Sequence, residues 1–352
     1  MTDPTHPQLR SITDLGMPLY PAYSYWCGDF FGPWFGWWWG GYYGGSSNAW
    51  VSTDGGLAFV GTHWVGDSNG TWTSQVVYIA LGDLDMPVVV THDVTHGSRD
   101  AFSLVGDSSD TSAFYLSYRD LVGAAPTDWK DLAHYRYYAQ RWTEDASAKD
   151  VHAGDSTNVP GQLVRAWKSG DRTLYATQDD PYTWSDTNSY WTSDPRLMLL
   201  SKEDSSTASL LDVHTFDKRN LQSLVAAGDR LYLTTSNGYY YDSSKTQSPD
   251  DQLDRLVVFD TTAGTLNPRF DATLGLSGTQ AMGIRNGRLF LDVSGGGVLT
   301  LDVTDPTLPV GRSFLRTLGW GNTLDISSDT LFVAAGNFGV FQRDLTTATL
   351  AP

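Results

Sequence analysis

Short apolar stretches alternate with turn residues along most of the chain. Between residues 280 and 345, apolar runs of four to seven residues are bounded by Gly, Asn, Asp and Pro. One run, residues 289–293, follows an Asn286-Gly287 turn, and another, residues 331–335, follows a similar short turn. Runs of this length with such turns between them are typical of β-strands joined in hairpins. The pattern therefore predicts antiparallel sheet and little helix.

The same group of strands recurs at intervals of about 40 to 50 residues, a period typical of propellers and solenoids. Two copies occupy residues 280–345, and four more precede them. The second strands of those four copies are predicted at residues 57–61, 113–118, 173–177 and 230–235. Each complete copy ends in a fourth strand. Six four-stranded antiparallel units predict an all-β fold, a six-bladed β-propeller.

The two ends of the repeat array carry related hexapeptides. Residues 2–7 are TDPTHP, and residues 304–309, between the third and fourth strands of the fifth copy, are TDPTLP. By this comparison residues 8–14 form a fourth strand, which the last copy lacks. We therefore expect the N-terminal strand to close the ring and to cover a sheet edge. The alternatives are a fragment of a longer propeller, and seven blades if residues 17–47 contain strands of their own.

Residues 295–314 (GGGVLTLDVTDPTLPVGRSF) and 329–345 (DTLFVAAGNFGVFQRDL) resemble bacterial surface or secreted β-propellers of the LVIVD-repeat type. Blades of that family have the approximate pattern G-L-x-I-x-D-V-S-D-P-x-x-P. The match is good over residues 280–345, fair at residues 1–15 and 221–260, and poor elsewhere. The resemblance implies a propeller and an extracytoplasmic protein, secreted or at the cell surface, whose leader is absent from this chain. It implies no catalytic residues.

Composition agrees with one all-β domain over residues 1–352. The 40 acidic residues include only two Glu, Glu144 and Glu203, and there are 35 Gly. Asp and Gly favour turns, whereas Glu favours helices. The net charge of −17 excludes the basic surface that nucleic acid binding requires. No stretch is long and apolar enough for membrane insertion, and the single Cys27 excludes an intramolecular disulfide.

Long insertions separate several of the predicted strands. Residues 17–47 form a Trp-, Tyr- and Gly-rich insertion that follows the first predicted fourth strand. Four others, at residues 63–74, 119–133, 178–195 and 237–254, separate second from third strands. In an up-and-down blade the loops after the second and fourth strands leave the same face. We therefore expect all long loops on one face, which is called the loop face below, with tight turns on the opposite face.

The loop face is predicted to be a recognition surface. Exposed Trp and Tyr side chains are enriched in binding sites, and aromatic rings beside Asp and Asn are suited to sugars. The predicted ligand-binding residues are Trp34, Trp37, Trp38, Trp39, Tyr42, Tyr43, Trp64, Trp72, Tyr182, Trp184, Tyr190, Trp191, Tyr239, Tyr240 and Tyr241. The alternative for the Trp-rich insertion is a small core that caps the central channel.

Calcium is the cofactor that the Asp-rich loops suit best, because carboxylate oxygens are its preferred ligands. The candidate metal ligands are Asp179, Asp180, Asp186, Asp250, Asp251 and Asp254. No complete calcium-loop motif is present, and the pattern does not require any cofactor.

The sequence thus favours a non-catalytic binding propeller of an exported bacterial protein. We expect it to recognise a polysaccharide or a surface protein through the aromatic, Asp-rich loop face. Two other functions fit the same residues. One is a glycan-active hydrolase or lyase that uses loop Asp residues as acid and base. The other is a structural module of a surface assembly, for which a large exposed apolar patch would be expected.

Overall fold

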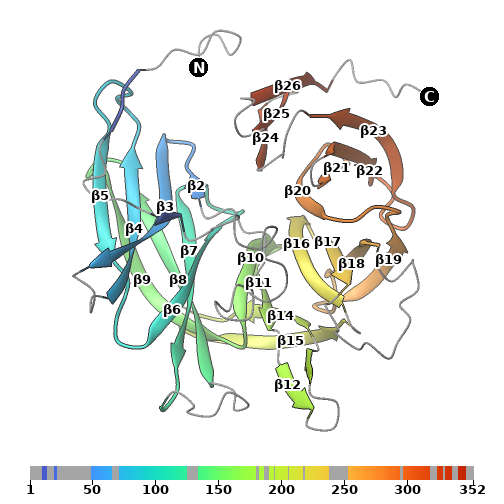
Figure 1. Cartoon of the computed structure of the whole chain (residues 1–352), viewed down its shortest axis with the longest axis horizontal. Coiled ribbons are helices and arrows are strands. Elements are labelled where there is room, and N and C mark those ends of the chain that lie inside the picture. The colour runs from blue at the N-terminus through green and yellow to red at the C-terminus, as the bar shows by residue number, and fades with distance from the viewer. Residues whose placement is uncertain are drawn as a thin grey trace.

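The computed structural model describes residues 10–13, 20–21, 49–65, 71–124, 134–179, 182–185, 190–193, 195–204, 206–216, 219–237, 253–293, 296–317, 323–327, 330–334 and 340–345. Every regular element in these ranges is a β-strand. Apart from one separate two-stranded hairpin, the described strands form six antiparallel sheets that follow one another around a ring, from the blue first sheet to the red last one (Figure 1). The protein is therefore a β-propeller, and the prediction of six blades is confirmed.

The first three blades have these strands. Blade 1 contains β1 (Tyr20–Pro21), β2 (Ala49–Val51), β3 (Gly56–Val65), β4 (Thr71–Ala80) and β5 (Val88–Asp93). Blade 2 contains β6 (Arg99–Gly106), β7 (Ala113–Leu121), β8 (Tyr135–Asp145) and β9 (Asp150–Val159). Blade 3 contains β10 (Gln162–Ser169), β11 (Arg172–Asp179), β14 (Arg196–Lys202) and β15 (Ala208–Thr215). Between β11 and β14 a separate hairpin is formed by β12 (Tyr182–Ser185) and β13 (Tyr190–Ser193).

The last three blades are more regular in length. Blade 4 contains β16 (Arg219–Ala227), β17 (Arg230–Asn237), β18 (Arg255–Asp260) and β19 (Asn267–Thr273). Blade 5 contains β20 (Thr279–Arg285), β21 (Arg288–Val293), β22 (Gly297–Asp302) and β23 (Val310–Arg316). The described part of blade 6 contains β24 (Thr323–Ser327), β25 (Thr330–Ala334) and β26 (Val340–Asp344).

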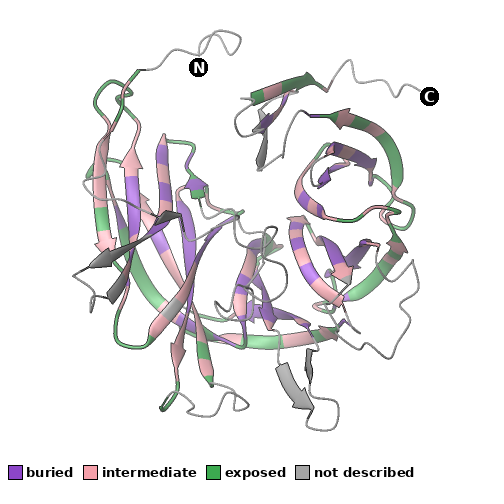
Figure 2. Ribbon diagram, in the orientation of Figure 1, coloured by how far each residue is buried: buried purple, intermediate pink, exposed green. Residues whose placement is uncertain are grey.

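The core lies between the blades. Second and third strands such as β11 and β18 are buried along most of their length, whereas fourth strands such as β19 and β23 are largely exposed (Figure 2). Five clusters of buried apolar side chains each join two successive blades. In the first, Trp50 of blade 1 packs on Phe114 of blade 2, with ring centroids 5.0 Å apart. The burial of apolar surface in these clusters is the main contribution to the stability of the ring.

Many Asp residues bind their own turns between third and fourth strands. Asp145, Asp204, Asp260, Asp302 and Asp305 each accept a hydrogen bond from the backbone N–H two residues later. Asp and Asn favour such turns because a short side chain can reach these N–H groups. This geometry explains why Asp rather than Glu occupies these five positions.

The predicted closure of the ring by residues 8–14 is not confirmed in the described residues. Residues 10–13 are not in a strand. Arg10 instead makes a bidentate contact with Asp85, with Nε–Oδ1 2.8 Å and Nη2–Oδ2 2.5 Å. Asp85 lies between β4 and β5, so this ion pair holds residue 10 beside blade 1. Residues 8, 9 and 14 lie outside the described part of the chain.

Some predicted loops are partly strand. The insertion at residues 63–74 is an extension of β3 and β4, with only residues 66–70 between the two strands, and the one at 178–195 contains the β12–β13 hairpin. Within the described ranges, no helix has the length and apolar character needed to cross a membrane.

Candidate functional site

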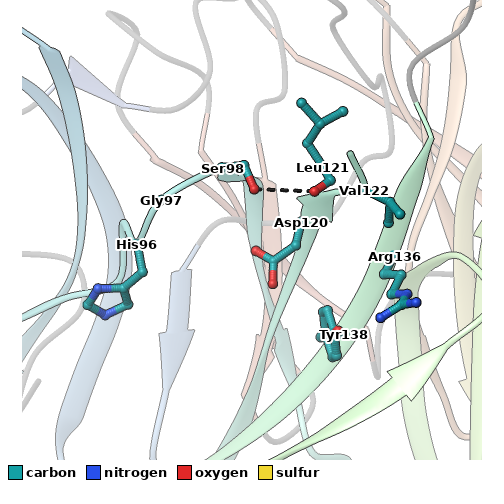
Figure 3. A pocket seen from close by; sticks show the side chains of 8 residues that line it. All are labelled: His96, Gly97, Ser98, Asp120, Leu121, Val122, Arg136 and Tyr138. Carbon is teal, nitrogen blue, oxygen red and sulfur yellow. Dashed lines mark hydrogen bonds between the residues drawn. The ribbon is translucent and has the colours of Figure 1, made fainter. Parts of the chain in front are cut away.

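A cavity of about 440 Å³ lies at the loop end of blade 2. It is lined by residues 96–98, residues 120–122, Arg136 and Tyr138 (Figure 3). Residues 96–98 follow the fourth strand of blade 1, and residues 120–122 lie at the end of the second strand of blade 2. The cavity therefore lies where a loop after a fourth strand meets the end of a second strand. This is the loop face that the sequence predicts for binding.

The register of β7 and β8 brings the side chains of the cavity together. Asp120 is directly opposite Arg136, and Tyr118 is directly opposite Tyr138. Residues two apart on a strand share a face, so all four lie on one face of blade 2. The rings of Tyr118 and Tyr138 stack with centroids 5.2 Å apart, and Phe102 of β6 lies 6.2 Å from Tyr118. This aromatic row supports the polar pair next to it.

Arg99 of β6 is held between this aromatic row and Asp120. Its guanidinium carbon lies 4.0 Å from the centre of the Tyr118 ring, and its Nε donates a hydrogen bond to Asp120 Oδ1 at 3.4 Å. The phenol of Tyr118 is also within hydrogen-bond distance of Ser156 Oγ, at 2.8 Å. Burial raises the pKa of the Tyr118 phenol, so this group stays neutral at physiological pH. The base of the cavity is thus fixed by contacts within blade 2.

The rim of the cavity is tied to the same strands. Ser98 Oγ donates a hydrogen bond to the carbonyl oxygen of Leu121 at 3.4 Å (Figure 3). Gly97 has a φ of 59°, a backbone conformation that favours glycine in this turn. These contacts hold residues 96–98 against the end of β7.

The side chain of Arg136 differs from that of Arg99, because it has no hydrogen bond or ion pair with any described residue. Residue 136 is exposed, and its guanidinium lies at the cavity wall (Figure 3). The site therefore offers a guanidinium with no partner among the described residues, a carboxylate already bonded to another arginine, a serine and the ring of Tyr138. Such a set can bind a polar ligand by hydrogen bonds and by contact with a ring face.

The cavity lies on the loop face that the sequence predicts, but its lining residues were not predicted. The insertion at residues 119–133 was predicted as a loop, whereas residues 119–121 continue β7. Asp120, Arg136 and Tyr138 were not among the predicted ligand-binding residues. A signal was present in the sequence HYRYYAQRW at residues 134–142, where aromatic residues and arginines alternate within a single strand.

Six of the predicted ligand-binding residues lie in the strands of two extended hairpins. In blade 1, Trp64 of β3 is directly opposite Trp72 of β4. In blade 3, Trp184 of β12 is directly opposite Trp191 of β13. Tyr182 and Tyr190 belong to the same hairpin, opposite Ser193 and Ser185. The other predicted ligand-binding residues lie outside the described part of the chain, namely Trp34, Trp37, Trp38, Trp39, Tyr42, Tyr43, Tyr239, Tyr240 and Tyr241.

The ends of the Trp-rich insertion are located by β1 and β2. Pro21 pairs with Gly61, and Ala49 pairs with Phe59, on the same edge of β3. Residues 22–48 therefore interrupt the first strand of blade 1. The prediction that the insertion follows a fourth strand is wrong in this respect, since Tyr20–Pro21 already belongs to the first strand. First strands of successive blades are neighbours, because β2 contacts β6 and β6 contacts β10.

Two of the six predicted metal ligands are described, and both have protein partners. Arg196 Nη2 lies 2.8 Å from Asp179 Oδ2 across β11 and β14. Asp254 is buried, and its Oδ2 accepts hydrogen bonds from the backbone N–H and the hydroxyl of Thr279 at 2.5 and 2.7 Å. Burial raises the pKa of Asp254. Asp180, Asp186, Asp250 and Asp251 lie outside the described ranges.

Within the described ranges, no three His, Cys, Asp or Glu residues are grouped so that they could hold a metal ion. The calcium site remains a prediction, because four of its six candidate ligands lie outside these ranges.

The chain is similar in structure to several solved proteins of low sequence identity. A protein of unknown function from Dyadobacter fermentans is 11% identical, with 81% of this chain and 88% of that chain covered and a TM-score of 0.49. The β-propeller domain of Cps50 (Swd1) from Myceliophteria thermophila is 10% identical, with coverages of 87% and 85% and a TM-score of 0.48. Apo AztD from Citrobacter koseri is 13% identical, with coverages of 87% and 84% and a TM-score of 0.45. No protein-family model matches the chain, and the search of curated proteins found no relative.

Proposed function

We propose that this protein is a non-catalytic propeller that binds a polysaccharide through its loop face, with the blade 2 cavity as the central subsite. The observation that carries the proposal is the grouping of Asp120, Arg136, Ser98 and Tyr138 around one open cavity on that face. A sugar presents hydroxyl groups at its edge and C–H groups on its ring faces. Charged and hydroxyl side chains can form hydrogen bonds with the hydroxyl groups, and an aromatic ring can pack against the C–H groups.

The two Trp-bearing hairpins extend the proposed surface. They project from blades 1 and 3, on either side of blade 2, and each has two tryptophans opposite one another. The loops after second strands leave the same face as the cavity. We propose that Trp64, Trp72, Trp184 and Trp191 contact further sugar units of a polymer, together with the other aromatic residues predicted for this face.

The setting of the protein and the role of calcium are also proposals. The resemblance of residues 280–345 to LVIVD-repeat propellers supports an exported protein, secreted or held at the cell surface. Calcium, if required, would be bound by the Asp residues of the loops at 178–195 and 237–254. A surface protein is the alternative partner.

A binding role accounts for the cavity better than hydrolysis does. Glycoside hydrolases of the common type use two carboxyl groups on opposite sides of the scissile bond. Among the described residues that line the cavity, Asp120 is the only carboxylate, and it is bonded to Arg99.

The proposal is tested by applying the protein to a glycan array and to insoluble polysaccharides, with calcium and with a chelator. An Asp120→Asn variant removes the carboxylate of the cavity. An Asp271→Asn variant is the matched control. Asp271 also pairs with an arginine on the neighbouring strand, since its Oδ1 lies 2.6 Å from Arg255 Nε. This pair lies on the outer edge of blade 4, away from the cavity.

The expected result is binding of one class of polysaccharide by the wild type and the Asp271→Asn variant. Binding by the Asp120→Asn variant should be about tenfold weaker or more, as expected for a lost hydrogen bond to a charged group. Thermal unfolding of each variant shows that it is folded. Absence of binding to any glycan, with and without calcium, would reject the proposal and favour a protein partner.

A further inference from the structure

The blade 2 cavity has a different charge from the protein as a whole. The chain has a net charge of −17. Among the described residues, the Arg and Asp side chains at the polar end of the cavity and directly behind it are two arginines, Arg99 and Arg136, and one carboxylate, Asp120. A site with an excess of positive charge on an acidic protein favours an anionic group in the ligand.

The excess charge can be assigned to one residue. Asp120 Oδ1 and Arg99 Nε are 3.4 Å apart, and Arg99 also lies over the Tyr118 ring. Arg99 therefore neutralises Asp120 and is held in place by the ring. Arg136 faces Asp120 across β7 and β8 but forms no ion pair or hydrogen bond with any described residue. Within the described part of the chain, nothing competes with a ligand for its guanidinium.

A guanidinium is well matched to a carboxylate, because two parallel N–H groups can donate to the two carboxylate oxygens. Tyr138 lies next to Arg136 in the cavity (Figure 3). A carboxylate bound at Arg136 would place the sugar ring that bears it beside Tyr138, with Ser98 at the opposite rim. A neutral sugar would leave the charge of Arg136 without a partner.

We infer that the cavity binds a carboxylate-bearing sugar, of the uronic acid class, and that Arg136 binds its carboxylate. The inference rests on the proposed function in that the ligand is a glycan. It adds the ligand class and the residue that selects it.

The test compares acidic polysaccharides with their own uncharged forms. Polygalacturonate, alginate and hyaluronate are each applied alongside the same polymer after reduction of its carboxyl groups to alcohols. Binding is measured for the wild type and for Arg136→Gln and Arg136→Lys variants. The control is Arg172→Gln, which removes the same charge from an exposed residue at the start of β11, at the opposite ends of the strands.

The wild type should bind at least one acidic polymer about tenfold or more tightly than its reduced form. Arg136→Gln should remove that preference, Arg136→Lys should keep part of it, and Arg172→Gln should keep all of it. Equal binding of acidic and reduced polymers, or binding of neutral glycans only, would overturn this inference and leave the proposed function standing. Loss of preference in Arg172→Gln as well would show a general charge effect and would also overturn it. Failure to bind any glycan would reject both.

Discussion

Thr234, near the end of the second strand of blade 4, donates a hydrogen bond from its hydroxyl to the carbonyl oxygen of Thr279, the first residue of blade 5, over a distance of 2.8 Å. Ser117 has the equivalent position in blade 2, and its hydroxyl accepts a hydrogen bond from the backbone N–H of Leu163 in blade 3 at 3.0 Å. Both hydroxyl groups are fully buried. The second strands of blades 2 and 4 are thus bonded directly to the first strands of blades 3 and 5.

A Thr234→Val variant should test this connection. Valine keeps the shape of the side chain but leaves the buried carbonyl of Thr279 without this donor, so the free energy of unfolding should fall by about 1 to 3 kcal/mol. Urea unfolding provides the measurement. Thr273→Val, on the exposed strand β19, is the control and should change stability by less than about 0.5 kcal/mol. An equal effect of both substitutions would show that the inter-blade bond has no special contribution.

Asp292 occupies the position of Thr234 in blade 5 and behaves differently. It is buried, its Oδ1 has no hydrogen-bond partner, and burial raises its pKa to about 7. The folded protein therefore holds a proton that the unfolded chain releases near pH 4, so Asp292 lowers stability progressively as pH rises from about 4 to 7.

An Asp292→Asn variant should remove this dependence. We expect it to be more stable than the wild type at pH 8 by roughly 1 to 3 kcal/mol, and equally stable at pH 3, where the wild-type carboxyl is protonated in both states. Urea unfolding at the two pH values measures the difference. A variant that is less stable than the wild type at pH 8 would show that Asp292 is charged and has a favourable partner.

For the aspartates in turns, we expect the stability of the protein to respond to acid in the opposite direction. Backbone N–H groups, first that of Ser206, hold the pKa of Asp204 at about 2, below its ordinary value of 3.8. Its contribution to stability is present above pH 4 and is lost as pH falls towards 2. An Asp204→Asn variant keeps an acceptor in the turn, so its melting temperature should fall less steeply between pH 4 and pH 2 than that of the wild type. Identical slopes would contradict the assignment.

Gly297 is required by the close approach of β22 to β23. Its φ is 138°, and a Cβ there would overlap the carbonyl oxygen of Leu315. Gly297→Ala should therefore destabilise the protein by about 3 kcal/mol or more, since backbone must move. Gly311, in the neighbouring strand β23, has no atom within 4 Å of the same position, and Gly311→Ala is the control. Thermal unfolding of the two variants should differ clearly, and similar melting temperatures would contradict the packing described.

The blades could be predicted from sequence because each depends on local patterns. The runs at residues 173–177 and 230–235 lie within β11 and β17, since buried strands flanked by tight turns are visible without knowledge of the partner strand. The cavity could not be predicted in the same way. It depends on the register that sets Asp120 opposite Arg136 and on the bond from Arg99, which lies on β6, the first strand of the blade. The contact of Arg10 with Asp85 joins residues 75 positions apart and has no local signal.

The most direct test of the account is to locate the bound glycan by hydrogen–deuterium exchange. The wild-type protein is compared with and without a saturating amount of the polysaccharide that it retains. We predict slower amide exchange at residues 96–99, 120–122 and 134–138, which surround the cavity, and no change at the turns 146–149 and 203–207 on the opposite face. Protection confined to those turns, or spread over the outer strands with none at the cavity, would contradict the assignment of the blade 2 cavity as the binding site.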